Sequence, residues 1–307
     1  MSNLGREKLD WSPDVWSLID QAVHDETVQT KVAAKFLPLR PNPGVMVTPS
    51  DTIDPATMTV DQGTVTPLIE IWKEFALTGE QVTKESELHT AVTLATRAAN
   101  LLSQAEDLLI FQGQDVVTTD RFKSLGVQYR NGPAGQGLLK SAGEAVPVDP
   151  IADDSRKWGQ NTFSAIAQAY ADLQGNGQYG PYALVLPTVP YADTYAPLKD
   201  SGLTTPADRI KPLVTAGFYG TGTLPAPNGV ADAPFEGVLV SLGGNTMDLV
   251  VGIDPTTAFV QEDGKGLYRF RVFERFALRP KDNTAIVELD FEPKVGKGAL
   301  RRGGKRR

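Results

Sequence analysis

The first strong periodic pattern of apolar residues begins near residue 12. Ser12 is a favourable N-cap residue, Pro13 suits the first helical position, and Asp14 places an acid in the first turn. The residues that follow place apolar side chains along one stripe, at Val15, Trp16, Ile19, Ala22 and Val23. The pattern predicts an amphipathic helix that runs to about Lys35.

The longest periodic segment runs from Leu88 to Phe111. Its apolar residues keep helical spacing for about six turns, at Ala91, Leu94, Ala95, Ala98, Leu101, Leu102, Ala105, Leu108 and Leu109. Gly113 is expected to end this helix. A helix of this length can form a coiled-coil seam, but its alanine content favours packing against a sheet. Just before it, residues Thr66 to Leu77 alternate between apolar and polar side chains and predict a strand.

Prolines interrupt the segment between the first helix and this strand. They argue against a helix and against a central strand, at Pro38, Pro41, Pro43, Pro49 and Pro55. Residues 38–66 are therefore predicted to form an extended arm. Residues 116–151 are rich in glycine, proline and polar side chains, which predicts loop with short strands.

The second half of the chain mixes short helices with strands. Helical patterns cover 158–173, 190–198 and 206–215, and strand patterns cover 181–187, 268–278 and 284–291. A long loop is expected at 217–234. Residues 237–242 and 247–253 flank Gly243 and Gly244, which predicts a hairpin with a two-glycine turn. Because regular βαβ alternation is missing, the predicted fold class is α+β.

The composition argues against the common kinds of catalytic and metal site. The 307 residues include no cysteine, which excludes disulfides, thiolate metal sites and a cysteine nucleophile. The two histidines, His24 and His89, stand in helical patterns without a partner at metal-ligand spacing, so a packed or solvated role is favoured. The glycine-rich stretches lack the lysine and the strand-to-helix context of a phosphate loop. The residues therefore predict no catalytic group and no metal site.

Charge is unevenly distributed along the chain. The segment from Lys297 to Arg307 holds six basic residues and no acid, and subtracting these from the net charge of −7 leaves −13 on the rest. Such a segment is predicted to be disordered. Weak contact with nucleic acid is one interpretation, and a solvated terminus is the more common one. No apolar run reaches the roughly 18 residues of a membrane helix, so a cytoplasmic protein is expected.

Three groups of residues, in order along nearly the whole chain, resemble the family-one encapsulins, also called linocin-like shell proteins. The first group is Leu9, Trp16, Ile19 and Asp20. The second is Pro67–Glu70 and Phe75–Leu77, followed by Ala105–Asp107 and Ile110–Gly113. The third is Gly180–Leu184, Gly243–Gly244, Leu249, Gly252, Tyr268–Phe270, Glu274 and Phe276. The arm near Arg40 departs from the family, because it lacks the usual Gly-Pro-x-Gly-Trp sequence.

The resemblance implies the major capsid fold of tailed phages (Hong Kong 97 phage type), in which an N-terminal helix, an extended arm, a long spine helix and a compact axial sheet domain are combined. It implies a division into an interior-facing helix (1–37), an extended arm and elongated loop (38–87), a peripheral domain with the spine helix (88–157), an axial domain (158–255), returning strands of the peripheral domain (256–293) and a basic tail (294–307). The implied function is a self-assembling icosahedral shell, without enzymatic activity, that encloses a cargo enzyme through a C-terminal targeting peptide. Ferritin-like proteins and dye-decolorising peroxidases are frequent cargo in the family.

The resemblance also implies site residues. The cargo peptide is expected to bind Leu9, Trp16, Ile19 and Val23, although the same residues would equally form the core face of the helix. The pore loop is expected at Lys199, Asp200, Ser201, Gly202, Leu203, Thr204 and Thr205, where a plain surface turn would look the same.

Some relatives hold flavin with an aromatic residue at a position occupied here by Thr78, Gly79 and Glu80. No flavin or other cofactor is therefore predicted. Two alternative functions stay open: a phage or prophage major capsid protein that encloses DNA, and a soluble two-domain enzyme, for which no site emerges.

Overall fold

The computed structural model describes residues 4–54, 56–132, 135–151, 157–197, 203–226 and 234–291. The chain forms two compact units, of which the first comprises Met1–Ala142 and Leu242–Ala285 and the second Gly143–Ser241 and Ile286–Arg307. The predicted axial domain, 158–255, corresponds to the second unit, but its limits differ from those of the unit, whose first segment begins at Gly143 and ends at Ser241. Residues 242–255 belong to the first unit, and residues 286–291, expected among the returning strands, belong to the second. The predicted basic tail, 294–307, lies outside the described residues.

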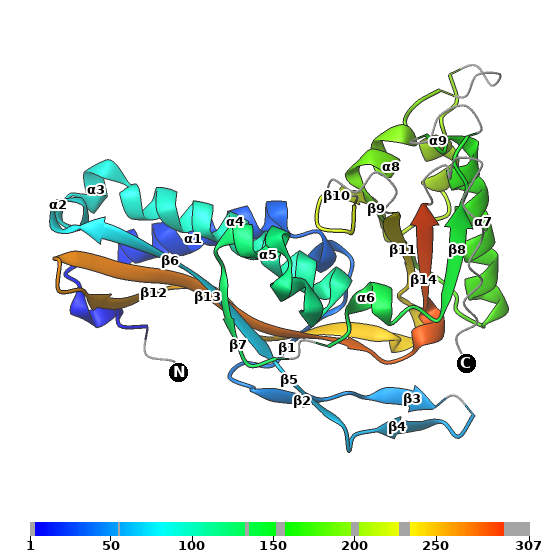
Figure 1. Cartoon of the computed structure of the whole chain (residues 1–307). Helices are drawn as coiled ribbons and strands as arrows, with labels where there is room; N and C mark the ends of the chain where they lie inside the picture. The colour runs from blue at the N-terminus through cyan, green and yellow to red at the C-terminus, as the bar shows by residue number, and fades with distance from the viewer. Residues whose placement is uncertain are drawn as a thin grey trace. The chain divides into compact units, whose positions relative to one another are not determined.

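A five-stranded sheet with the order β1-β12-β13-β6-β7 is the framework of the first unit (Figure 1). Its strands are β1 (Leu39–Pro41), β6 (Ile69–Thr78), β7 (Gln128–Arg130), β12 (Met247–Glu262) and β13 (Leu267–Pro280). β1 runs parallel to β12, whereas the other neighbours are antiparallel. Phe270 stands opposite Phe75 across β13 and β6, and their stacked rings, 5.3 Å between centroids, favour this register.

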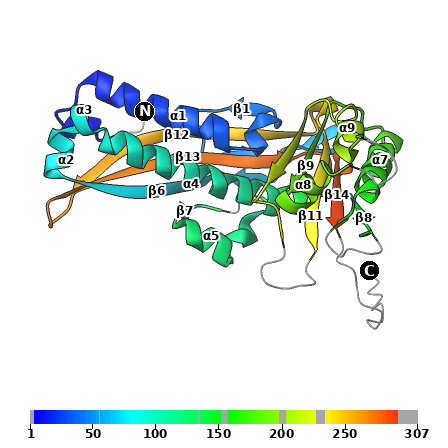
Figure 2. The same ribbon diagram turned by 90° about the horizontal axis from the view of Figure 1, so that it is seen from above.

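Two long helices, α1 (Pro13–Thr30) and α4 (Thr90–Gln112), lie along this sheet (Figures 1 and 2). α4 packs on β6 and β13, and α1 packs on α4 and β12. The long helix therefore lies against a sheet, as its alanine content predicted. Its C-terminal glycine, Gly113, has φ 80°, and a Cβ there would lie 2.2 Å from the carbonyl oxygen of Gln136, so no other residue fits.

The first helix is shorter than predicted. The hydroxyl of Ser12 accepts a hydrogen bond from the N–H of Val15 at 3.4 Å, which confirms the N-cap. At the other end, Lys31 leaves the helical conformation with ψ 124°, and a short 3₁₀ turn, η2 (Ala33–Lys35), follows. The N–H groups of Val32 and Ala33 donate to the Asp107 carboxylate at 2.9 and 3.0 Å. This tertiary hydrogen bonding replaces the helical bonds that the local pattern predicted.

The proline-rich segment forms an arm of two short antiparallel ladders. Its strands are β2 (Val47–Pro49), β3 (Thr52–Asp54), β4 (Thr59–Asp61) and β5 (Val65–Pro67), with β2 paired to β5 and β3 paired to β4. β4 is exposed throughout and β3 largely so. This segment is therefore extended, as the prolines indicated.

Short helices complete the first unit. They are η1 (Arg6–Lys8), α2 (Gly79–Thr83), α3 (Glu85–Leu88), η3 (Gln114–Thr118), α5 (Asp120–Leu125), α6 (Gly137–Lys140), η4 (Gly243–Asn245) and η5 (Asn283–Ala285). The range 116–151, predicted as loop with short strands, thus also holds two short α-helices. The N-cap of α5 is Thr119, whose hydroxyl accepts from the N–H of Phe122 at 3.3 Å.

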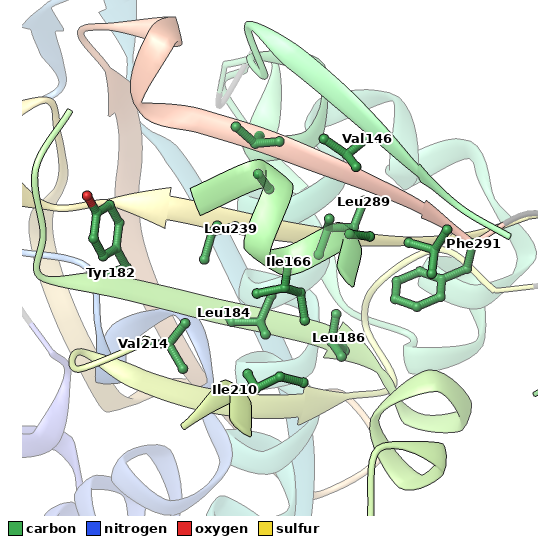
Figure 3. Packing of buried hydrophobic residues seen from close by; sticks show 14 of the residues in the cluster. Val146, Ile166, Tyr182, Leu184, Leu186, Ile210, Val214, Leu239, Leu289 and Phe291 are labelled. Atoms are coloured by element: carbon green, nitrogen blue, oxygen red, sulfur yellow. The ribbon is translucent and has the colours of Figure 1, made fainter. Parts of the chain in front are cut away.

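A second five-stranded sheet, ordered β10-β9-β11-β14-β8, forms the second unit together with helices. The strands are β8 (Glu144–Val148), β9 (Tyr182–Pro187), β10 (Gly217–Thr221), β11 (Phe235–Ser241) and β14 (Ile286–Phe291), and the helices are α7 (Gln160–Gly175), α8 (Thr188–Asp193) and α9 (Pro206–Ile210). Figure 3 shows Leu184 and Leu186 of β9 packed with Ile166 of α7 in its core. β9 confirms the predicted buried strand. β10 was missed, because its residues fall in the predicted loop 217–234.

The predicted hairpin around Gly243 and Gly244 is wrong. β11 pairs with β9 and β14, whereas β12 pairs with β13 and β1, so the two strands belong to different sheets. The residues between them form η4, in which Gly244 has φ 69°. The two glycines locally favour a turn, but β11 pairs with β9 and β14, and β12 pairs with the long strand β13.

Candidate functional site

The N-terminal segment and α1 line a surface cavity of about 710 Å³. Its lining residues are Arg6, Glu7, Leu9, Trp11, Pro13, Trp16, Ser17, Asp20, Gln21 and His24. Two indole rings and a leucine provide its apolar part, and charged groups surround them. Such a mixture suits a ligand that has both apolar side chains and polar backbone groups.

Arg6 holds this segment in place. Its guanidinium donates to both carboxylate oxygens of Asp20, at 2.6 and 2.8 Å, and to the carbonyl oxygen of Thr257 at 2.7 Å. It also lies 4.6 Å from the ring centroid of Trp16. One arginine therefore connects the N-terminal segment, α1 and β12, and its contact with the indole adds cation–π attraction.

An aromatic cluster supports the floor of the cavity. The Trp11 ring stacks on Phe270 at 5.3 Å and lies 4.9 Å from Trp16, and its indole N–H donates to the carbonyl oxygen of Val82 at 2.8 Å. Gly5 lets the chain approach β12, because a Cβ there would lie 2.5 Å from the carbonyl oxygen of Phe259. These contacts order the cavity before any ligand arrives.

A second cavity, of about 480 Å³, continues along α1. Its lining residues are His24, Thr27, Val28, Lys31, Ala34, Lys35, Leu39, Glu106, Leu249, Val251, Ile253, Asp254, Pro255, Glu274 and Phe276. His24 lines both cavities, so the two adjoin on the same helix. The two cavities together are called the α1 groove below.

A buried charged cluster lies at the base of the second cavity. The Lys31 ammonium pairs with the carboxylates of Glu106 and Glu274, both 2% exposed. Burial alone would lower the pKa of Lys31, but the two carboxylates raise it above its ordinary value. One ammonium group thus faces two carboxyl groups, and the carboxyl group of Asp107 lies close to them.

The excess of acids raises the affinity of the cluster for protons. Burial, and then the Glu106 carboxylate, raise the pKa of Glu274 to about 8, and burial raises the pKa of Asp107 to about 7. Among the described residues, Oε1 of Glu274 has no hydrogen-bond partner. A proton on Glu274 at neutral pH therefore offsets the shortage of positive charge.

The four residues predicted to bind a cargo peptide divide into two pairs. Leu9, which is half-buried, and Trp16, which is 6% exposed, both line the first cavity. Ile19 and Val23 are fully buried and line neither cavity. The alternative role, the core face of the helix, describes this second pair.

Sequence reasoning missed several groove residues. Trp11 was overlooked although it lies two positions after Leu9, and a pair of nearby tryptophans is a usable signal for a binding surface. Leu249, Val251 and Ile253 come from β12, far away in the sequence, and no local pattern connects them with α1.

Part of the predicted pore loop, Lys199, Asp200, Ser201 and Gly202, lies outside the described residues. Leu203 is 91% exposed. Thr205 caps α9: its N–H donates to the Asp208 carboxylate at 2.9 Å, and its hydroxyl accepts from the Asp208 N–H at 3.3 Å. The pore role of residues 199–205, Thr204 included, stays a prediction.

Solved structures define the fold of this chain. The chain is similar to a virus-like particle subunit from Pyrococcus furiosus, with a TM-score of 0.65, 18% identity and coverage of 89% of this chain and 98% of that chain. It is also similar to the SrpI encapsulin of Synechococcus elongatus (TM-score 0.54, 10% identity, coverage 87% and 89%) and to the capsid of Myoviridae phage XM1 (TM-score 0.52, 16% identity, coverage 74% and 74%). The predicted α+β major capsid fold is therefore confirmed.

The family follows from the sequence. The model of the Linocin M18 family, described as encapsulating protein for peroxidase, matches residues 1–121 and 134–277. The type 1 encapsulin shell protein EncA of Myxococcus xanthus is 29% identical over 234 residues, which cover 76% of this chain and 69% of that protein. A diheme-cytochrome–encapsulin shell fusion protein of Kuenenia stuttgartiensis is 24% identical over 294 residues, covering 90% and 72%. The chain belongs to this encapsulin family, as the resemblance indicated, and the predicted function of an icosahedral shell protein is confirmed.

Within the described part of the chain, no helix is long and apolar enough to cross a membrane.

Proposed function

We propose that the shell formed by this chain is a cytoplasmic nanocompartment that encloses a cargo enzyme, and that the targeting peptide of this enzyme binds in the α1 groove. The observation that carries the proposal is the meeting of the two cavities at His24, on the helix that sequence reasoning selected. The shell subunit itself carries out no reaction in this proposal, since the chemistry belongs to the enclosed enzyme.

The groove suits a short extended peptide. Leu9, Trp11 and Trp16 offer apolar surface at one end, and Val28 and Ile253 do so at the other. Each apolar side chain that a peptide buries there contributes about 1.5–3 kcal/mol. Ile19 and Val23 act beneath the groove, where they fix α1 against its neighbours. Two or three such contacts hold a peptide reversibly, and the many copies of a shell provide avidity.

A peroxidase of the dye-decolorising type or a ferritin-like protein is the proposed class of cargo. The family description, encapsulating protein for peroxidase, supports the first of these. Both would bind the groove through a C-terminal segment that extends beyond the folded domain of the cargo enzyme. Selectivity then depends on the peptide and not on the cargo enzyme as a whole.

The test is co-expression of the shell with a fluorescent protein that carries the C-terminal segment of the enzyme encoded beside the shell gene. Leu9→Asp and Val28→Asp should abolish fluorescence in purified shells without changing shell yield, because both residues face the groove. Leu88→Asp is the matched control, since Leu88 is 52% exposed on α3, outside the groove. Full loading in both groove variants would refute the peptide site.

Val23→Asp separates the two roles of the helix. Because Val23 is fully buried, a charge there should prevent folding or shell formation rather than loading alone. The ultraviolet spectrum and electron microscopy of wild-type particles distinguish a nanocompartment shell from the alternative, a phage or prophage capsid that encloses DNA. Particles filled with DNA would favour a phage capsid protein, and a small oligomer at every concentration would refute both shell functions.

A further inference from the structure

Hydrogen bonds attach the arm to its own sheet at several points. At its start, the N–H groups of Asn42 and Gly44 donate to the carbonyl oxygens of Val251 and Gly252 on β12, at 2.8 and 3.0 Å. These bonds continue the pairing of β1 with β12 and determine where the arm leaves the sheet. A second attachment is needed to determine its direction.

Arg279, at the end of β13, makes the second attachment. Its side chain is 2% exposed. Nε and Nη2 donate to the two carboxylate oxygens of Asp248 on β12, at 2.7 and 2.6 Å. Nη1 donates to the arm: to the carboxylate of Asp51 at 2.5 Å and to the carbonyl oxygen of Pro49 at 3.2 Å. One guanidinium therefore joins the sheet to the arm.

The groups around Arg279 keep this attachment charged and ordered. Burial alone would raise the pKa of Asp248, but Arg279 and Lys281 hold it below its ordinary value. Lys281 contacts Asp248 at 2.9 Å, and its backbone carbonyl oxygen accepts from the N–H of Ile53 on the arm at 2.8 Å. The planar fork of an arginine suits these divergent acceptors, and a lysine ammonium does not.

A cavity lies beside this attachment. Its volume is about 580 Å³, and arm residues, including Thr52 and Thr66, line it together with residues 278–284. Apolar side chains of the arm are exposed: Met58 by 82%, Val65 by 57% and Val60 by 48%. Within the described chain, β3 and β4 pair only with each other. These side chains suit contact with a second copy of the chain.

We propose that Arg279 is a positioning residue that sets the direction of the arm, and through it the angle between neighbouring subunits and the diameter of the shell. The inference rests on the proposed shell function. From Asp51 to Asp54, where the turn between β3 and β4 begins, the strand spans roughly 10 Å. A rotation of about 10° at Arg279 then moves this turn by about 2 Å, which is about half the range of an apolar contact.

The test compares shell diameters by electron microscopy. Arg279→Lys keeps the charge but loses the fork, and Asp51→Asn leaves the Arg279–Asp248 pair intact while weakening the arm contact. Both variants should give broadened or shifted diameters, or open shells, with faster proteolytic cleavage in the arm. Asp263→Asn is the control, because it removes the 2.8 Å pair with Arg269 at the opposite end of β13 and should leave the diameter unchanged.

The outcomes separate this inference from the shell function. If Arg279→Lys does not fold, Asp51→Asn carries the test, since its change is confined to the arm. Wild-type diameters and wild-type arm protection in Asp51→Asn would overturn the role of Arg279 while leaving the shell function intact. Failure of the wild-type protein to form shells would overturn both.

Discussion

Replacing Glu274 by glutamine should remove a large part of the pH dependence of stability. Glu274 is buried beside Lys31 and Glu106, and its pKa rises from 4.5 to about 8 on folding. The unfolded chain releases this proton near pH 4.5, whereas the folded chain keeps it until about pH 8. Stability from this group is therefore complete below the unfolded pKa and is lost as pH rises toward the folded pKa.

The magnitude follows from the width of this interval. Each pKa unit corresponds to about 1.4 kcal/mol, so the free energy of unfolding should fall by about 4 kcal/mol between pH 5 and pH 8 through Glu274 alone. Asp107, whose pKa rises to about 7, acts in the same direction. At about 2–4 °C per kcal/mol, the Glu274 part lowers the melting temperature by roughly 10 °C.

The assay is thermal unfolding followed by tryptophan fluorescence, at matched ionic strength across this pH range. Glu274→Gln mimics the protonated side chain, so it should match the wild type near pH 5 and melt several degrees higher near pH 8. Glu80→Gln is the control, because Glu80 is 73% exposed and pairs with Lys84 on the surface. Equal pH slopes for the wild type and Glu274→Gln would refute the buried-proton account.

Two further substitutions test the same framework. Lys31→Met leaves the buried Glu106 carboxylate without its cation and should cost about 3–5 kcal/mol by denaturant titration. A loss below about 1 kcal/mol, which is the contribution of a surface ion pair, would contradict the burial of this cluster. Gly113→Ala places a Cβ 2.2 Å from the carbonyl oxygen of Gln136 at φ 80° and should lower the yield of folded protein, whereas unchanged melting would show that this turn relaxes freely.

Much of the fold could be predicted from local sequence pattern. α1, α4, α7, β6, β9 and β13 were all expected near their observed positions, because an amphipathic helix or strand repeats its apolar residues within a short window. The capping residue Ser12 and the terminating Gly113 also act locally. Leu9 and Trp16, two of the predicted binding residues, line the groove. They are close in sequence, Leu9 just before α1 and Trp16 in its first turn, so a local pattern was enough to select them.

The tertiary structure decided the features that depend on distant partners. α1 ends at Thr30 because the N–H groups that follow it donate to Asp107, which lies 75 positions after Val32 in the chain. The two strands beside Gly243 separate because each pairs elsewhere. The α1 groove likewise needs β12, and the attachment of the arm needs Asp248 and Arg279. The sequence by itself determined the long helices, most of the long strands, the family and the α+β class. Which side chains share a buried charge or a cavity was decided by long-range packing, because burial changes the energy of a charged or apolar group only once its neighbours are in place.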